Sequence, residues 1–172
     1  MQVVKAPDTR LRFKTKPVKK ITPELLKTIQ QMVKLTKTYT DPEGVGLAST
    51  QIGESEQYFI LKEKSGSFKT VFNPQILKYS PKTKIYFEGC LSIPNYYGEV
   101  SRSTSVTVSY QDPQGKKVQE ILKGLEAWIF QHEYDHLQGK LFIDYVMANK
   151  GKLYHVVGRD RAGGEIFEEV GY

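Results

Sequence analysis

The sequence predicts an α+β fold in which antiparallel β-sheets pack around a central helix. Three observations support this class. Short segments rich in β-branched and aromatic residues fill the middle of the chain, two helical patterns lie on either side of them, and helices and strands are segregated. With 172 residues, of which 39% are hydrophobic and 26% charged, the composition is that of a folded globule. We therefore assign residues 1–172 to a single domain.

The first helix is expected from Thr22 to about Tyr39. Thr22 suits the N-cap position, and Pro23 suits the first helical position. Apolar residues then recur at helical spacing and form one stripe, which consists of Leu25, Leu26, Ile29, Met32 and Val33. This helix should pack on the core through that stripe.

The middle of the chain predicts short strands separated by Gly, Pro, Asn or Ser: QYFILK, KTVF, QILKYS and TKIYFEG. The segment TSVTVSY alternates strictly, and QDPQGKK supplies a turn before the return strand KVQEIL. These two strands indicate an antiparallel hairpin. The tail, KLYHVVGRDRAGGEIFEEV, predicts two more strands around the turn AGG, with His155 structural or exposed.

A second helix is expected over about residues 123–138. Residues recur at spacings of three or four and predict one inward stripe: Leu125, Trp128, Ile129, His132 and His136. Gly139 can end this helix in a left-handed conformation. The two histidines should therefore face the protein interior instead of water.

Charge and cysteine content limit the partners and the compartment. The formal charge of +6 favours acidic neighbours, but the densest basic stretch, KTKPVKK, lacks interleaved aromatics and matches no nucleic-acid motif. A single cysteine, Cys90, suits a reducing compartment. No apolar run is long enough to span a bilayer. We expect no DNA or membrane partner and a cytoplasmic location, with an organellar stroma or matrix as the alternative.

His132, Glu133 and His136 form the pattern HExxH. On a helix, both imidazoles project from one face and can bind one ion, while Glu133 can reach a metal-bound water. The alternative is a pair of core histidines with satisfied hydrogen bonds. The central helix is therefore a candidate metal-binding helix.

A catalytic ion of this kind needs a third ligand, which could be a carboxylate downstream or a histidine. The metzincin pattern HExxHxxGxxH fails, because Phe142 stands where the third histidine would be. Upstream, Cys90 follows Gly89 in YFEGCLSIP and offers a thiolate, although a lone cysteine is often only a small buried side chain. A thiolate with two imidazoles is a plausible ligand set for several divalent metals.

Three motifs resemble those of the peptide deformylase family: GVGLASTQ at 44–51, EGCLS at 88–92 and HEYDHLQG at 132–139. The segments PDTRLRFKTKPV, VFNP and GKLFIDY extend the resemblance over about the first 145 residues. The resemblance implies hydrolysis of the N-formyl group from the formylmethionine that begins a nascent polypeptide, with release of formate.

The resemblance also implies the roles of the site residues. Cys90, His132 and His136 would bind one divalent metal ion, which is Fe(2+) in vivo, with Zn(2+), Ni(2+) or Co(2+) as replacements. Glu133 would act as base and then as acid. The Gln51 side chain and the backbone N–H of Leu91 would stabilise the oxyanion.

Substrate contacts are implied as well. Val45 and Gly46 would pair with an extended peptide, and Gly89 would let a backbone approach closely. The methionine pocket would be lined by residues near Tyr86, Leu125, Trp128 and Ile129. Glu88 and Arg102 would form a supporting ion pair. Asp135 is expected to support the site or the helix without binding the metal.

Departures from the family bear on specificity and partners. Ser49 replaces an alanine and needs a hydrogen-bond partner, while Trp128 and Tyr86 make the preference for methionine less secure than the chemistry. The tail is acidic and strand-like, so ribosome docking through a basic C-terminal helix is not carried over from the family. We expect a monomer that binds formylated nascent peptides and contacts the ribosome transiently. Alternatives are a zinc endopeptidase with the same helix and a non-catalytic basic module that binds ribosomal RNA or nascent chains.

Overall fold

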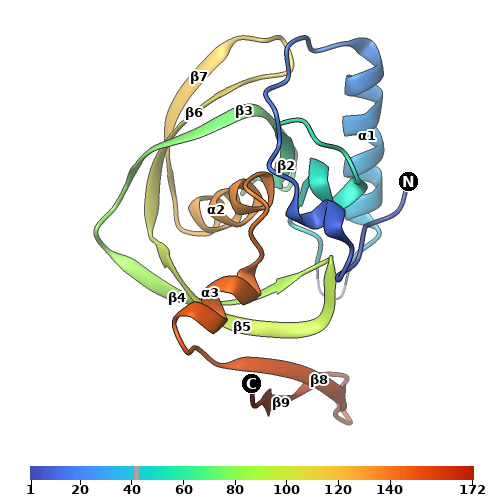
Figure 1. The fold of residues 1–172 in the computed structure, drawn as a ribbon, viewed down its shortest axis with the longest axis vertical. Helices are drawn as coiled ribbons and strands as arrows, with labels where there is room; N and C mark the ends of the chain where they lie inside the picture. The colour runs from blue at the N-terminus through green and yellow to red at the C-terminus, as the bar shows by residue number, and fades with distance from the viewer. Residues whose placement is uncertain (41–42) are drawn as a thin grey trace.

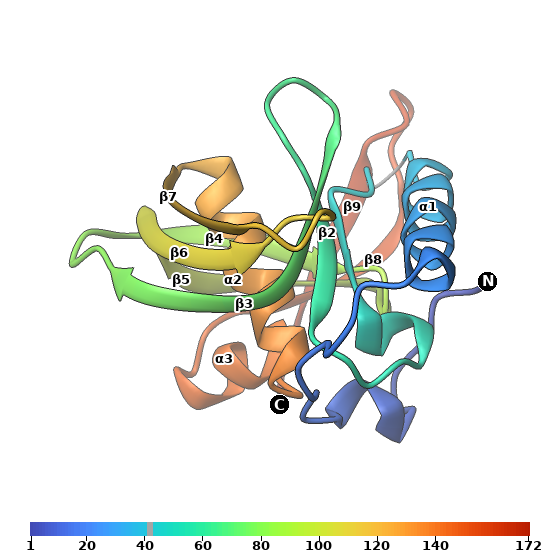
Figure 2. The same ribbon diagram turned by 90° about the horizontal axis from the view of Figure 1, so that it is seen from above.

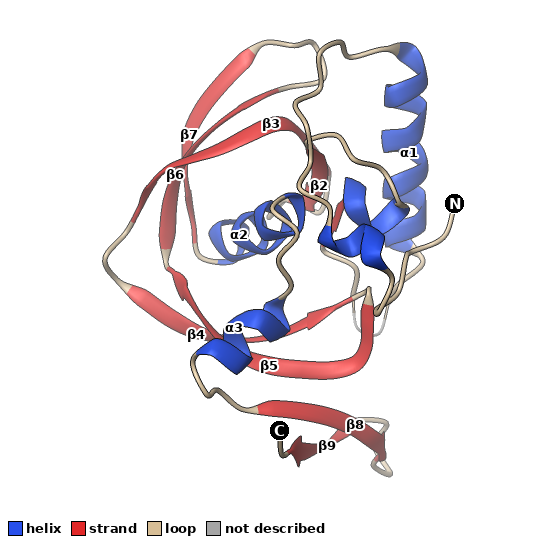
Figure 3. Ribbon diagram, viewed as in Figure 1, coloured by secondary structure: helices blue, strands red, loops and turns tan. Residues whose placement is uncertain are grey.

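The computed structural model describes residues 1–40 and 43–172, which form two antiparallel sheets and three α-helices (Figures 1 and 3). The five-stranded sheet has the order β1-β2-β3-β6-β7 and the four-stranded sheet the order β4-β5-β8-β9. The strands of the first are β1 Gly46–Ala48, β2 Tyr58–Lys62, β3 Phe68–Tyr79, β6 Ser105–Gln111 and β7 Lys117–Lys123. Those of the second are β4 Thr83–Cys90, β5 Ile93–Ser103, β8 Leu153–Arg159 and β9 Glu165–Val170. The predicted α+β class with antiparallel sheets is confirmed.

The helices are α1 Pro23–Lys37, α2 Leu125–Leu137 and α3 Phe142–Ala148, with short 3-10 turns η1 Thr9–Arg12 and η2 Ser49–Ile52. The first two are confirmed predictions. Thr22 caps α1, because its hydroxyl accepts the N–H of Leu25 at 3.2 Å. Gly139, after α2, has a φ of 70°, in the left-handed region that glycine tolerates. None of the helices in the described part of the chain is long and apolar enough to cross a membrane.

Helix α2 lies inside the molecule, with β2, β3 and β6 on one side and β4 and β5 on the other (Figure 1). Its apolar side chains belong to the main core, where the ring of Phe130 packs edge-on against Phe59 with centroids 5.0 Å apart. The predicted inward stripe is wrong for Leu125, which is 48% exposed. Leu125 is the first residue of the helix, directly after the β6–β7 hairpin, and the sheets do not yet cover it.

Helix α1 covers the other face of the five-stranded sheet, as seen from above in Figure 2. Ile29 and Met32 are buried there against Leu47, Ile60 and Phe72. Strands β1 and β2 therefore lie between α1 and α2, with α1 on the face opposite α2.

Three parts of the fold were not anticipated by the sequence pattern. The segments KTVF and QILKYS form one strand, β3, in which the register shifts around Asn73 and Pro74. Strand β5 contains Pro94, Asn95 and Gly98, which normally indicate loops, but it is held between β4 and β8. Helix α3 has only 7 residues, too few for a helical period to stand out.

The predicted strands of the tail are confirmed as the hairpin β8–β9. β8 pairs with β5 through Tyr96–His155 and Tyr97–Tyr154, so the hairpin completes the four-stranded sheet (Figure 1). His155 also packs its ring against Tyr96, with centroids 4.7 Å apart.

A buried ion network joins the four-stranded sheet to α2. Arg102 on β5 donates from Nε to Glu88 Oε1 at 2.8 Å and from Nη2 to Oε2 at 3.0 Å, and it also pairs with Asp135 on α2. Tyr145 on α3 donates to Asp135 at 2.9 Å. Because all three charged side chains are buried, each depends on the others for compensation.

Replacing Arg102 by methionine should therefore destabilise the protein strongly. Two buried carboxylates would lose their cation, and breaking a buried pair in this way costs about 3–5 kcal/mol. Chemical denaturation at equal metal content measures the change. Arg10→Met is the matched control, because the pair of Arg10 with Asp8 is exposed and should leave the unfolding free energy nearly unchanged. An Arg102→Met variant as stable as this control would contradict the expectation.

Candidate metal centre and catalytic site

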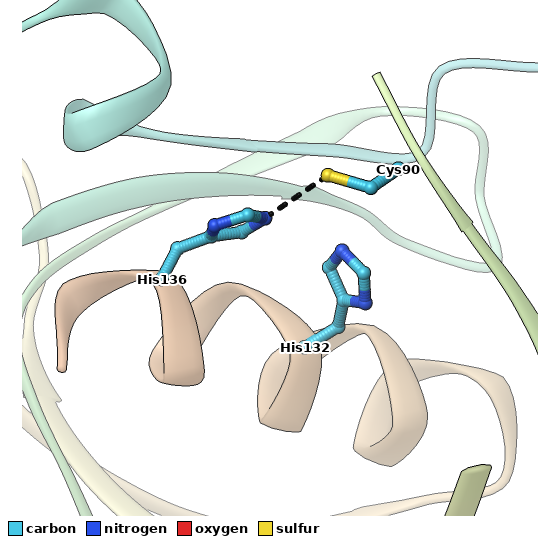
Figure 4. A group of neighbouring side chains, drawn as sticks. All are labelled: Cys90, His132 and His136. Atoms are coloured by element: carbon cyan, nitrogen blue, oxygen red, sulfur yellow. Dashed lines mark hydrogen bonds between the residues drawn. The ribbon is translucent and has the colours of Figure 1, made fainter. Parts of the chain in front are cut away.

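Cys90 ends strand β4, and His132 and His136 lie on the facing side of α2 (Figure 4). The ligand atoms of the three residues lie within 4.8 Å of one another, and Cys90 Sγ is 3.3 Å from His136 Nε2. The sulfur and both rings point toward a common space in Figure 4. Strand and helix thus bring together residues that are more than 40 positions apart in the sequence.

This donor set fits a divalent metal ion. Metal–ligand bonds of about 2.0–2.3 Å place the ligand atoms of a tetrahedral site roughly 3.3–3.8 Å apart. The 3.3 Å between Cys90 Sγ and His136 Nε2 falls in this range, and because all three ligand atoms lie within 4.8 Å of one another, small side-chain movements would close the site around an ion. Among the described residues, the group contains three ligands, which leaves the fourth position of such a site for water or substrate. One sulfur and two nitrogens suit iron, zinc, nickel and cobalt, so the ligands alone do not select the ion.

The electrostatics of the two histidines differ. Burial lowers the pKa of His136 well below its usual value, which keeps the ring neutral, as a metal ligand must be. Burial also opposes charge on His132, but hydrogen bonds to Cys90 and Glu88 raise its pKa well above the usual value. A cation between the thiol and the two imidazoles would take the place of that shared proton.

Glu88 fixes the orientation of His132. Its carboxylate faces Nδ1 of His132 at 2.9 Å and accepts the indole N–H of Trp128 at 2.8 Å, in addition to both bonds from Arg102. Nδ1 is thereby engaged, and Nε2 is left to face Cys90. Burial alone would raise the pKa of Glu88, but hydrogen bonds from Arg102 and His132 hold it at about 2. The carboxylate therefore stays ionised.

Glu133 lies beside the ligands and is almost completely buried. Burial raises its pKa to about 7, and Oε2 is buried without a hydrogen-bond partner within the described structure. Its other oxygen lies against Gly46, where an added Cβ would come within 2.3 Å of Oε1. Gly46 thus makes room for the carboxylate, a reason for glycine beyond the predicted approach of a substrate.

Gln51 and Leu91 lie on the sulfur side of the site. The side-chain oxygen Oε1 of Gln51 accepts the N–H of Ala48 at 2.8 Å. This bond directs the side-chain nitrogen Nε2 to Cys90 Sγ at 3.4 Å and to Ser92 Oγ at 3.2 Å. The carbonyl of Leu91 accepts from Lys5 Nζ at 2.5 Å.

The hydroxyl of Ser49 has the partner that the sequence analysis required. It donates to the carbonyl of Glu56 at 2.6 Å. The exchange of alanine for serine in this motif therefore leaves the hydroxyl paired, and Ser49 begins the same η2 turn that carries Gln51.

A cavity of about 150 Å³ opens beside these groups. Of the residues predicted to contact substrate, five line it: Val45, Gly46, Gly89, Trp128 and Ile129. Tyr86 and Leu125 are not among the residues that line it. Tyr86 stacks on Trp128 with centroids 4.9 Å apart, so it supports a residue of the cavity wall without lining the cavity itself. The roles of these residues in binding remain predictions.

The cavity wall also contains residues that the sequence analysis missed: Glu43, Gly44, Phe87 and Tyr97. Phe87 precedes Gly89 by two positions on β4, so both residues lie on the same face of the strand. Strand periodicity could therefore have predicted Phe87 as a wall residue. Tyr97 is the partner of Gly89 in the β4–β5 register, and it could not be placed without recognising β5.

Comparisons with known proteins agree with this geometry. The sequence profile of the polypeptide deformylase family matches residues 1–152. A peptide deformylase of Thermotoga petrophila is 42% identical over 146 residues, which are 85% of this chain and 87% of the relative.

Solved structures agree as well. The crystal structure of peptide deformylase from Thermotoga maritima superposes with a TM-score of 0.77 and 40% identity, covering 84% of this chain and 95% of the other. A Synechococcus elongatus peptide deformylase in complex with actinonin gives 0.77 and 36%, covering 84% and 78%. The chain therefore belongs to the polypeptide deformylase family.

Proposed function

We propose that this protein is a metal-dependent hydrolase that removes the N-formyl group from the formylmethionine of nascent polypeptides and releases formate. Family membership supports this reaction. In this chain, the main support for the reaction is that the thiol of Cys90 and the imidazoles of His132 and His136 lie together at the edge of a cavity. The buried carboxylate of Glu133 lines the same cavity.

Cys90, His132 and His136 would hold the ion, and we propose Fe(2+) as the physiological metal because the family resemblance favours it. When bound, such an ion acts as a Lewis acid and makes hydroxide available near neutral pH. Zn(2+), Ni(2+) and Co(2+) suit the same ligands.

Glu133 is the proton carrier in this proposal. Its carboxylate borders the cavity next to His132, and its Oε2 has no partner in the described structure. It would accept a proton from the attacking water and deliver it to the departing amine, so that one side chain serves both as base and as acid.

Gln51 Nε2 and the backbone N–H of Leu91 would stabilise the negative charge on the formyl oxygen. Gln51 is held by its bond to Ala48, so its NH₂ group is directed at the ligand sulfur before substrate arrives. Donors that are fixed in advance need no reorganisation during the reaction.

The substrate backbone would bind between two strand edges. β1 and β4 each stand at the end of their sheet, and both border the cavity through Gly46 and Gly89. An extended peptide can add to such an edge as a further strand. The methionine side chain would then enter the space between Trp128 and Ile129.

We propose that the enzyme acts as a monomer on formylated nascent peptides, in the bacterial cytoplasm or in an organelle that starts synthesis with formylmethionine. Its formal charge of +6 favours transient contact with the acidic ribosome surface.

The proposed function is tested by anaerobic purification, metal analysis and a formate-release assay on formyl-Met peptides. We expect one metal ion per chain and rapid formate release. Glu133→Gln should keep the metal and lose activity by at least about 100-fold, because proton transfer is lost while the ligands remain. Cys90→Ala should lose the metal.

Each rival function predicts a different result. A zinc endopeptidase with another third ligand would keep its metal in Cys90→Ala and cleave internal peptide bonds. A ribosome-binding module would release no formate, and Glu133→Gln would leave its binding unaltered.

Trp128 should set the depth of the methionine pocket. It is held by its bond to Glu88 and by the ring of Tyr86, so it cannot easily move aside. Trp128→Leu should therefore raise the ratio of kcat/KM for formyl-Met over formyl-Ala peptides by about 10-fold, since a long side chain gains buried contacts. Trp128→Phe is the matched control, because it loses the same hydrogen bond but keeps most of the bulk. Equal ratios in both variants would contradict this role.

A further inference from the structure

The C-terminal hairpin β8–β9 lies beyond residue 152, where the match to the family profile ends, yet it packs against the wall of the cavity. β8 pairs with β5 at Tyr97, which itself lines the cavity. The hairpin therefore has a fixed position relative to the site.

Four aromatic rings join the hairpin to that wall. Phe87 stacks on Tyr97 with centroids 5.3 Å apart and an interplanar angle of 8°. Phe167 on β9 packs edge-on against both rings, at 5.2 Å from Phe87 and 5.3 Å from Tyr97. Tyr154 on β8 meets Phe87 at 5.4 Å. Offset and edge-on contacts at these distances are favourable, so Phe167 and Tyr154 hold the two cavity residues in place.

This aromatic wall, composed of Phe87, Tyr97, Tyr154 and Phe167, is partly open to solvent. Phe87 is 44% exposed and Phe167 is 39% exposed. Tyr97 covers Gly89, where an added Cβ would lie 2.6 Å from the tyrosine ring. Phe87 and Tyr97 line the cavity, and Tyr154 and Phe167 continue the wall from these two rings onto the hairpin.

A second hollow of about 200 Å³ adjoins the first. It shares Cys90, Leu91 and Tyr97 with the cavity, and the hairpin contributes Arg159 and Glu165 to it. The hairpin therefore borders a hollow that continues from the cavity on the side of Leu91.

We propose that the β8–β9 hairpin extends the peptide-binding cleft and selects substrates whose residue after formylmethionine is aromatic. This inference rests on the proposed function. An extended peptide advances about 3.4 Å per residue, so the side chain that follows methionine remains within reach of a wall that begins at the cavity. Aromatic side chains would gain ring contacts there that a methyl group cannot make.

The test compares kcat/KM for formyl-Met-Phe-Ala with that for formyl-Met-Ala-Ala in the full-length enzyme. The wild type should prefer the first peptide. Phe167→Ala should lower this ratio about 5–10-fold, which corresponds to the loss of one aromatic contact. Phe167→Tyr, which keeps the ring, should retain the ratio.

Ile166→Ala is the matched control. Ile166 is the neighbour of Phe167 on β9, is 44% exposed, and points to the opposite face because side chains alternate along a strand. It should keep the wild-type ratio. If Phe167→Ala fails to fold in a thermal melt, Phe167→Leu replaces it, since leucine keeps apolar bulk without a ring.

An unchanged ratio in the folded variant would overturn the inference. So would an equal loss of kcat/KM on both peptides, because a merely structural role affects every substrate alike. If the wild type released formate from neither peptide, the proposed function would fail instead, and this inference with it.

Discussion

The end of strand β4 and the helix α2 must keep a fixed separation, because Cys90 can meet His132 and His136 only across that gap. The buried carboxylate of Glu88 sets this separation. It lies one residue from Gly89 and two from Cys90, and it engages His132 on the facing helix at 2.9 Å. Arg102 holds the same carboxylate with two hydrogen bonds and also reaches Asp135 on α2. Strand, helix and ligand orientation are thus fixed by one network.

This network makes the fold and the site depend on the same side chains. A buried carboxylate without cations would be costly, whereas here Glu88 has donors from three residues, Arg102, Trp128 and His132. Glu133, one residue from His132, has no such donor to its Oε2 among the described residues, and burial raises its pKa to about 7. The two buried carboxylates near the ligands therefore suit different tasks in the proposed function: Glu88 remains ionised and orients His132, while Glu133 is suited to carry a proton.

Much of this site could be predicted from the sequence, because its key residues lie in short local patterns. The pattern HExxH predicts two ligands and a base on one helix, and the motif around Cys90 is recognisable by resemblance. What could not be predicted depends on contacts between distant segments. Tyr97 lies on β5, a strand rich in turn-forming residues that is held in place by its pairing with β4 and β8. Phe167 contacts the cavity residue Tyr97 only because the C-terminal hairpin pairs with that strand. Leu125 fits the helical period but lies at an uncovered helix end.

X-ray absorption spectroscopy of the metal in the anaerobically purified enzyme tests the central claim most directly. The account predicts one sulfur ligand at about 2.3 Å and two imidazole nitrogens at about 2.0–2.1 Å, with the sulfur signal absent from any metal retained by a Cys90→Ala variant. A shell of nitrogen and oxygen ligands without sulfur in the wild type would show that Cys90 does not bind the ion, and the proposed assembly of strand and helix around one metal would be wrong.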